Sequence, residues 1–193
     1  MNRQGNALIL REYMKLKIDT FKLKSMLWFI VTIVMIAADR ISKHYISTTM
    51  ELGEKTSVID NFFYITHHTN KGAAWGIFHN ADMTLILGIM SVVVSIVMIF
   101  IFFRFDKWPI HLSLAMIISG ALGNAYGRIL HGEVTDFLDF YIFGYDFPIF
   151  NVADMMVTVG TILLVVYILF FHKEPEKLTK KADESVLQEQ NNE

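Results

Sequence analysis

The stretch Phe147-Pro-Ile-Phe-Asn-Val-Ala-Asp154 leads directly into Met155–Phe171, a run without one charged residue. The segment from Pro148 onward is long enough to cross the hydrocarbon core of a bilayer as a helix, which takes about 20 residues. Asp154 therefore lies near the head of a predicted membrane span. A charge at membrane depth is costly and usually has a function, so this residue is the first candidate for chemistry.

Asp154 allows two interpretations, because an acid near the start of a helix is also favoured by the helix dipole. As an ordinary cap it would follow Pro148 at the first helical position and lie beside Asn151, a common capping residue. As a catalytic acid it needs a partner, and Asp136 in Val134-Thr-Asp-Phe-Leu-Asp-Phe140 is available. Two carboxylates that lie together on one water-exposed side of a membrane suffice for acid–base hydrolysis. Asp136 alone is better explained as part of a solvated acidic loop with Glu133 and Asp139.

Three further segments predict membrane helices, in a chain of 193 residues of which 53% are hydrophobic. Met83–Phe103 and Trp108–Gly127 are uncharged runs of 21 and 20 residues. Ser25–Ala38 has only 14 uncharged residues, so it spans only if its helix continues through Asp39 and Lys43. It also resembles a cleaved signal peptide, but a retained helix is favoured because the residues before Asp39 form only a weak cleavage site. The sequence thus predicts an α-helical polytopic membrane protein with four transmembrane helices.

The distribution of basic residues predicts the orientation of these spans. Four crossings place 12 of the 17 lysines and arginines on one side of the membrane, which the positive-inside rule makes the cytoplasm. Both termini are then cytoplasmic, and the ends of the spans that carry the acids face outward. The 12 residues are Arg3, Arg11, Lys15, Lys17, Lys22, Lys24, Arg104, Lys107, Lys173, Lys177, Lys180 and Lys181.

The outer segment 51–80 is too polar to span. Val58–Thr66 is rich in β-branched and aromatic residues, which favours a strand. Asn70–Gly76 has the small residues of a tight turn, and Trp75 suits the headgroup level of a membrane. We expect a small extracytoplasmic β-strand platform within one membrane domain, residues 25–172. A basic cytoplasmic extension, 1–24, precedes this domain, and a polar cytoplasmic tail, 173–193, follows it.

Several other kinds of chemistry lack their motifs. The chain has no cysteine, which excludes thiolate catalysis and disulfides, and it has no Gly-x-Ser-x-Gly or His-Glu-x-x-His motif. His67 and His68 are adjacent, so on a strand they point to opposite faces and do not form a metal site together. The basic amino-terminal stretch fits attraction to anionic lipid. No metal, cofactor or nucleic acid is expected.

Four blocks of sequence, in order, resemble the lipoprotein signal peptidase (signal peptidase II) family of bacterial membrane aspartyl proteases. Each block alone is modest, but together they extend from the first span into the last. The blocks are Asp39-Arg-Ile-Ser-Lys43; Asn70-Lys-Gly-Ala-Ala-Trp-Gly76; Gly123-Asn124 through Arg128 to Val134-Thr-Asp-Phe137; and Phe150-Asn-Val-Ala-Asp154.

The resemblance implies removal of the signal peptide from diacylglyceryl-modified prolipoproteins, just before the lipidated cysteine, by a catalytic pair, Asp136 and Asp154. It implies a substrate groove that opens to the bilayer, at the extracytoplasmic side of the bacterial cell membrane. The expected partners are this substrate and membrane lipid, and the protein is expected to be a monomer. The implied supporting and substrate-binding residues are Asp39, Lys43, Asn70, Gly72, Asn124, Arg128 and Asn151.

One position departs from the family pattern. Position 127, usually an aspartate before Arg128, is a glycine. Either another group such as Tyr126 replaces the acid in the polar wall, or the chain is a divergent homologue that binds lipoprotein precursors or lipid with weak or no cleavage. A transporter that uses membrane-embedded acids is a further alternative. It would place those acids deeper in the spans than this sequence does.

Overall fold

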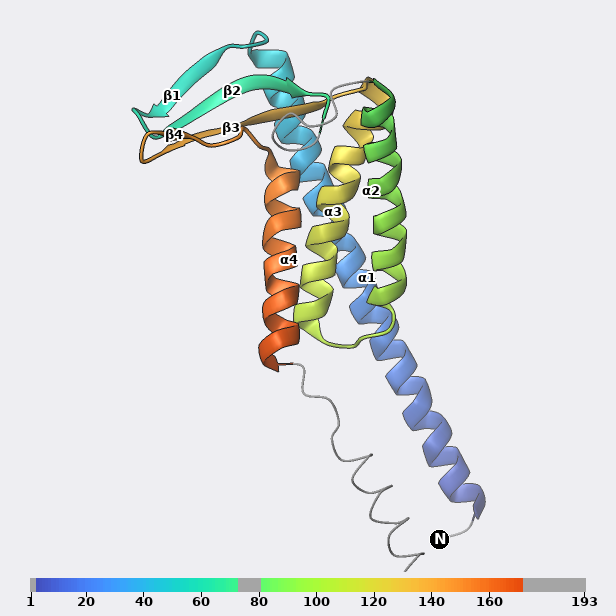
Figure 1. The fold of residues 1–193 in the computed structure, drawn as a ribbon. Helices are drawn as coiled ribbons and strands as arrows, with labels where there is room; N and C mark the ends of the chain where they lie inside the picture. The colour runs from blue at the N-terminus through green and yellow to red at the C-terminus, as the bar shows by residue number, and fades with distance from the viewer. Residues whose placement is uncertain (1–2, 73–80, 172–193) are drawn as a thin grey trace, which may run out of the picture.

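The computed structural model describes residues 3–72 and 81–171. Helices form a bundle, and a small sheet covers one end of it (Figure 1). The expected tail and the Trp75 part of the predicted turn lie outside the described residues. In chain order the elements are α1 (Arg3–Thr49), β1 (Lys55–Ile59), β2 (Phe63–Asn70), α2 (Ala81–Phe102), α3 (Trp108–His131), β3 (Val134–Ile142), β4 (Tyr145–Asp146) and α4 (Val152–Phe171).

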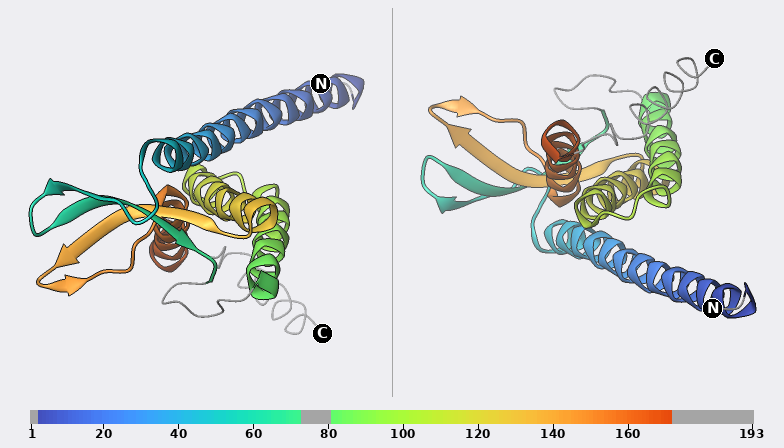
Figure 2. Two further views of the ribbon diagram at one scale, coloured as in Figure 1. Left: turned by 90° about the horizontal axis from the view of Figure 1, so that it is seen from above. Right: turned by 90° about the horizontal axis from the view of Figure 1, so that it is seen from below.

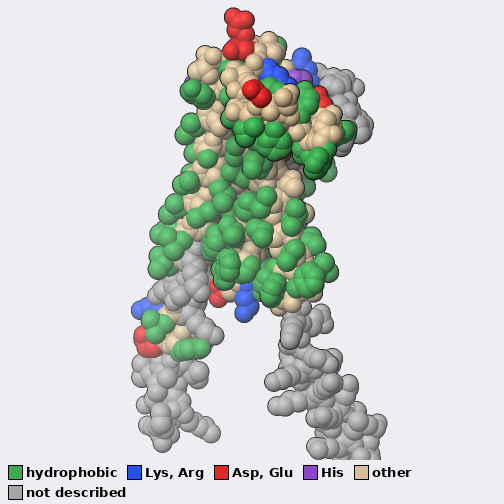
Figure 3. Space-filling model, turned by 90° about the vertical axis from the view of Figure 1, so that its left-hand side faces the viewer, with side chains coloured by type: hydrophobic (Ala, Val, Ile, Leu, Met, Phe, Trp, Pro, Cys, Tyr) green, Lys and Arg blue, Asp and Glu red, His purple; other side chains and the backbone are tan. Residues whose placement is uncertain are grey.

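Three stretches of helix among the described residues are long and apolar enough to cross a membrane: Ser25–Thr49, Met83–Phe102 and Val152–Phe171. The helix α3 is less apolar because it lies at the centre of the bundle, where it packs against α1, α2 and α4. Its buried face carries polar groups such as Ser113 and Asn124. Hydrophobic side chains cover the flank of the bundle, and charged side chains gather at its two ends (Figure 3), as a membrane protein requires.

The first helix continues through its charged residues, as a retained span requires. It runs unbroken past Asp39, Arg40 and Lys43 to Thr49. It also extends back to Arg3, so most of the predicted amino-terminal extension continues the same helix. Sequence reasoning had not anticipated that continuity.

Glycines allow α3 to approach its neighbours closely. A Cβ at Gly120 would collide with the carbonyl oxygen of Ala153 in α4. One at Gly123 would lie 2.5 Å from the Oδ2 of Asp39 in α1. Larger residues here would separate the three helices that carry the polar cluster described below.

The sheet is antiparallel, with the strand order β1-β2-β3-β4. Seen from above, it crosses the end of α4 and extends past the bundle (Figure 2). The prediction of strand over Val58–Thr66 was partly wrong, because a turn with Asn61 at φ 60° interrupts it. The strands β3 and β4 were not predicted. Asp136 therefore lies on a strand rather than in a solvated loop.

A one-residue bulge interrupts the pairing of β2 with β3. Ile65 pairs with Leu138 and the next pair is His68 with Asp136, so β2 has one extra residue between these pairs. Bulges of this kind re-aim side chains and are common beside active sites. Here the bulge absorbs the extra residue, so Asn70 lies on the same face of the sheet as Asp136.

Candidate active site

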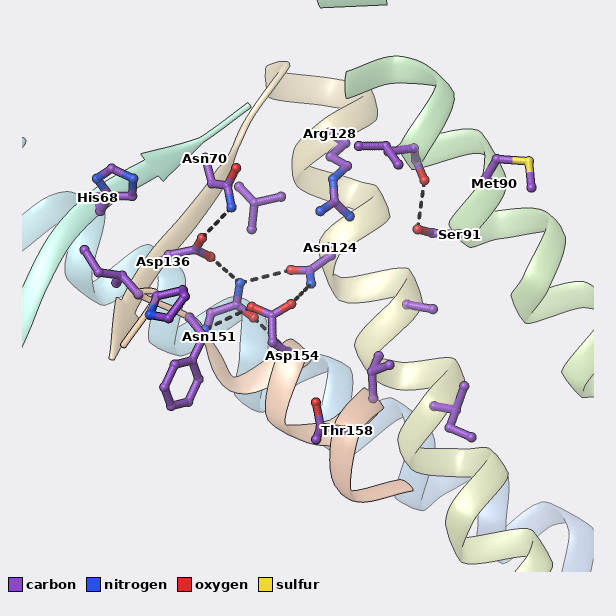
Figure 4. Close-up of a pocket in the computed structure, with 18 of the residues that line it drawn as sticks. His68, Asn70, Met90, Ser91, Asn124, Arg128, Asp136, Asn151, Asp154 and Thr158 are labelled. Atoms are coloured by element: carbon purple, nitrogen blue, oxygen red, sulfur yellow. Dashed lines mark hydrogen bonds between the residues drawn. The ribbon is translucent and has the colours of Figure 1, made fainter. Parts of the chain in front are cut away.

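Asp136 and Asp154 meet at the junction of the sheet and the bundle. Asp136 comes from the start of β3, and Asp154 from the first turn of α4. Asn151 lies between the two carboxylates and bonds to both (Figure 4). Its Nδ2 donates to Asp136 Oδ1 at 2.6 Å, and its backbone N–H donates to Asp154 Oδ2 at 3.1 Å.

Asp136 is almost fully buried, with 2% of its surface exposed. Its second oxygen, Oδ2, accepts a hydrogen bond of 3.0 Å from Asn70 Nδ2. Burial, followed by the nearby charge of Asp154, raises the pKa of Asp136 from 3.8 to about 6, although the two amide donors and Lys43 favour the ionised form. The sheet thus holds a carboxyl group that takes up a proton far more readily than an exposed aspartate does.

The cap and the catalytic interpretations of Asp154 are compatible, because its geometry serves the helix as well. Asn151 and Asp154 exchange hydrogen bonds, each accepting from the backbone N–H of the other at 3.1 Å. This is a capping box across the first turn of α4. The prediction that Pro148 occupies the first helical position was wrong, since α4 begins at Val152. The capping pair fixes where the helix starts and where the Asp154 carboxylate points.

A buried polar chain supports the pair from behind. Asn124 in α3 donates its Nδ2 to Asp154 Oδ1 at 2.7 Å. The Oδ1 of Asn124 accepts from Lys43 Nζ at 2.7 Å and from Asn151 Nδ2 at 3.2 Å. Lys43 also pairs with Asp39 at 2.9 Å, four residues before it on the same face of α1.

Asp39 extends this chain to α4. It accepts the backbone N–H of Ala153 at 3.0 Å, and no part of it is exposed. The first turn of α4 is thereby tied to α1, so the position of the Asp154 carboxylate depends on three helices.

Arg128 and Gly72 lie near the pair without contacting it directly. Arg128 lines the same cavity, and its Nη2 is 3.5 Å from the carbonyl oxygen of Gly72. The Nε of Arg128 is buried without a hydrogen-bond partner among the described residues. The backbone N–H of Gly72 donates to Asn70 Oδ1 at 2.9 Å, which orients the Asn70 amide toward Asp136.

Glycine at position 127 has a local reason. A Cβ there would lie 2.6 Å from the carbonyl oxygen of Glu133, so the chain leaving α3 packs directly on the helix backbone. Tyr126 does not replace the missing acid beside Arg128, because its ring lies under the guanidinium of Arg40, 3.9 Å from Arg40 Cζ.

The polar cluster forms one end of a cavity of about 830 Å³. Residues of α2 and α4, including Met90 and Val157, line its sides, and α3 contributes Ile117 and Ala121. The cavity therefore places the buried carboxylates beside an apolar wall formed by the helices. It is large enough for an extended peptide segment beside hydrocarbon, since binding sites for small molecules typically measure ~300–1,000 Å³.

Sequence reasoning missed some of the residues that line this cavity. His68 lines it, whereas His67 lines a different cavity, in agreement with the prediction that the two rings point to opposite faces. Ser91 and Thr158 also line the cavity from within α2 and α4. Polar residues inside apolar spans were the available signal. No group of three or more metal-ligating side chains occurs in the described part of the chain.

Comparisons with known proteins agree with this architecture. A family model described as signal peptidase (SPase) II matches residues 31–170. The lipoprotein signal peptidase of Staphylococcus aureus strain JH9 is 42% identical over 149 residues, which cover 74% of this chain and 90% of that protein. The protein of strain Newman gives the same values.

Solved structures give the same result. A bacterial membrane enzyme determined by the in meso method at 2.3 Å resolution matches with a TM-score of 0.69 and 36% identity, over 78% of this chain and 93% of that one. A second, at 1.9 Å resolution, gives 0.66 and 37% over 75% and 94%. The chain is a bacterial membrane protein that belongs to the signal peptidase II family of aspartic-type peptidases.

Proposed function

We propose that this protein is an intramembrane aspartyl endopeptidase that cuts diacylglyceryl-modified prolipoproteins just before the lipidated cysteine. The family acts in the cleavage of lipoprotein signal peptides. The single observation that carries the mechanism is the Asn151 bridge between Asp136 and Asp154, at the polar end of a cavity whose other end is apolar.

The two carboxylates would share one proton during hydrolysis. Burial and the charge of Asp154 raise the pKa of Asp136 to about 6, which disfavours ionisation of both groups at once. The ionised member takes a proton from the attacking water, while the protonated member polarises the scissile carbonyl and then protonates the leaving amine. The proton belongs to the pair, because coupled groups titrate as a unit.

The cavity suits a substrate that is part peptide and part lipid. Acyl chains and the signal peptide partition into hydrocarbon, and the side chains from α2, α3 and α4 offer them an apolar surface. Asn124, Arg128 and Asn151 supply polar groups for the peptide near the carboxylates. All these residues come from one chain, so a monomer suffices for the reaction.

The membrane topology is part of the proposal. All four helices cross the bilayer, with α3 shielded from lipid by the other three and 25–172 as the peptidase domain. The termini are cytoplasmic and the sheet is extracytoplasmic, in line with the basic residues at the amino-terminal end and between α2 and α3. Water then reaches the carboxylates from outside, while the substrate arrives through the membrane.

The test is cleavage of a purified lipidated prolipoprotein by Asp136→Asn and Asp154→Asn. Each variant should lose at least about a thousandfold in kcat/KM, because neither can complete the proton transfers. Asp139→Asn is the matched control, since Asp139 neighbours Asp136 on β3 but pairs with Lys55 at 2.6 Å, outside the cavity. This control should keep its activity. Wild-type cleavage by either dyad variant would refute the assignment, and an inactive wild-type protein would favour the silent homologue.

A further inference from the structure

A second cavity, of about 410 Å³, lies behind the active site. We call it the basic cavity. The end of α1, the end of α3 and the sheet enclose it, and many of its side chains are basic or carry hydroxyls. The residues that line it are Arg40, Lys43, His44, Ser47, Leu52, His67, Thr69, Gly127, His131, Glu133, Val134 and Thr135.

The basic cavity and the active-site cavity lie on opposite faces of β2 and β3. His68, Asn70 and Asp136 line the active-site cavity. The neighbouring residues His67, Thr69 and Thr135 line the basic cavity, as alternation along a strand requires. The two cavities therefore open on opposite sides of the sheet, with Val134 of β3 in the wall of both.

One stripe of α1 supplies most of the positive charge. Arg40, Lys43, His44 and Ser47 are spaced three and four residues apart, which places them on one face of a helix. Lys43 is buried, with 3% exposed, and lines the cavity while it bonds to Asp39 and Asn124. An ammonium group has three N–H donors, so one remains beyond these two bonds.

Arg40 is the cation with the most unused capacity. Its guanidinium lies over the Tyr126 ring, and no carboxylate of the described residues lies within 4.0 Å of it. A guanidinium offers five N–H donors in a planar fork that matches phosphate oxygens. The half-buried Glu133 is the one carboxylate among the residues that line the cavity.

Gly127 makes this side of the cavity more basic than the family pattern implies. The usual aspartate at this position would add a carboxylate close to these cations. Here the bare backbone of α3 forms that wall. Three imidazoles and three hydroxyls complete the lining, so the groups that can donate hydrogen bonds outnumber the single carboxylate. The described residues have no metal-ligand cluster, which leaves an anion as the matching ligand.

We propose that the basic cavity binds a phosphate group, either as inorganic phosphate or as the phosphate of a phospholipid headgroup. The cavity lies at the sheet end of the bundle, where the apolar flank gives way to charged residues (Figure 3). Headgroup phosphates lie at this level of a membrane. The volume exceeds that of a phosphate and leaves room for bridging water or for a glycerol moiety.

The test measures binding to the full-length protein in phospholipid-free, phosphate-free detergent. Inorganic phosphate is titrated by calorimetry, and phosphatidylglycerol added to a parallel sample is counted by native mass spectrometry. Arg40→Gln removes the free guanidinium, and Ser47→Glu places a carboxylate at an exposed position of the cavity wall. Both variants should weaken binding at least about tenfold, as expected for loss of a charge-assisted bond.

Thr48→Glu is the matched control. It adds the same charge at the next residue, which is also exposed but does not line the cavity. Both hydroxyls bond to the His44 carbonyl oxygen, at 3.0 Å from Ser47 and 2.8 Å from Thr48, so the two substitutions disturb the helix alike. The control should bind like the wild type.

The two ligands separate the two sources. A difference between wild type and Ser47→Glu with inorganic phosphate identifies a free-anion site, and a difference with phosphatidylglycerol alone identifies a lipid site. Equal binding by wild type and Ser47→Glu for both ligands overturns the proposal, as does equal weakening by Thr48→Glu.

Discussion

Asn151 has two separable functions, and two substitutions distinguish them. Its backbone and side chain cap α4 together with Asp154, and its Nδ2 binds Asp136. Asn151→Ala removes the cap and the bond to Asp136. Asn151→Ser keeps a side-chain oxygen that can cap the helix, but its hydroxyl is too short to reach Asp136. We expect both variants to be impaired in catalysis, and Asn151→Ala to be the less stable.

The expected magnitudes follow from these contacts. Loss of an N-cap costs about 1 kcal/mol, and loss of a hydrogen bond to a charged group costs about 1.5–3 kcal/mol. Asn151→Ala should therefore lower the free energy of unfolding by about 2.5–4 kcal/mol, and Asn151→Ser by about 1 kcal/mol less. Both variants remove one of the two amides that hold the Asp136 carboxyl and leave only Asn70. Each should therefore lose about a hundredfold in kcat/KM, the effect of a misplacement near 1 Å.

The pH profile gives an independent measurement. The Asn151 amide favours ionised Asp136, so its removal raises the pKa of Asp136 further. The alkaline limb of kcat/KM should move to higher pH in both variants, and unfolding in a denaturing detergent should rank their stabilities. Wild-type activity in Asn151→Ser would show that the bridge to Asp136 is not needed, and equal stability of the two variants would refute the cap.

Three further expectations follow. The pKa of Asp136 rises on folding from 3.8 to about 6, so between these pH values the folded protein keeps a proton that the unfolded chain releases. The free energy of unfolding should therefore fall by up to about 3 kcal/mol as the pH rises from 3.8 to about 6. A free energy of unfolding that does not change over this range would contradict the expectation. Gly127→Ala should lower the free energy of unfolding by about 1–3 kcal/mol, because the new Cβ would clash with the Glu133 carbonyl oxygen. Unchanged stability would show that the neighbouring backbone moves aside without cost. Lys43→Met should lower the free energy of unfolding by about 3–5 kcal/mol, because it leaves Asp39 buried without its cation. Adding Asp39→Asn should recover part of that loss. No recovery would show that the unpaired carboxylate is not what destabilises the single variant.

The helices and the positions of the acids could be predicted from the sequence. Uncharged runs mark spans in any protein of this kind, and the continuation of the first helix through Asp39 and Lys43 followed from the need for about 20 residues. The motif blocks then indicated which polar residues belong together. The structure joins Asp39, Lys43, Asn124 and Asn151 by hydrogen bonds.

The sheet was harder to predict because its central strand is covered on both faces. In β3, Asp136 and Phe137 point to opposite faces, yet both are buried. Such a strand lacks the alternation of polar and apolar residues that identifies a half-exposed one. The residues of α2 that line the cavity were also hidden, since an uncharged helix gives no sign of which side faces lipid. Met90 and Val97 are both apolar residues within the same uncharged run, but of the two Met90 lines the cavity and Val97 does not.

The extra residue in β2 has a consequence for how this protein can vary in length. Upstream of the bulge, Ile65 faces the same side of the sheet as Leu138, and downstream Asn70 faces that side with Asp136. Loss of one residue between Ile65 and His68 would remove the bulge without changing the pairs on either side of it, because His68 would still lie opposite Asp136 in a regular ladder. Asn70 would keep its face of the sheet and its place beside the carboxylates. A single-codon deletion here, in a stretch without catalytic side chains, should therefore leave cleavage largely intact, and complete loss of activity would contradict this expectation.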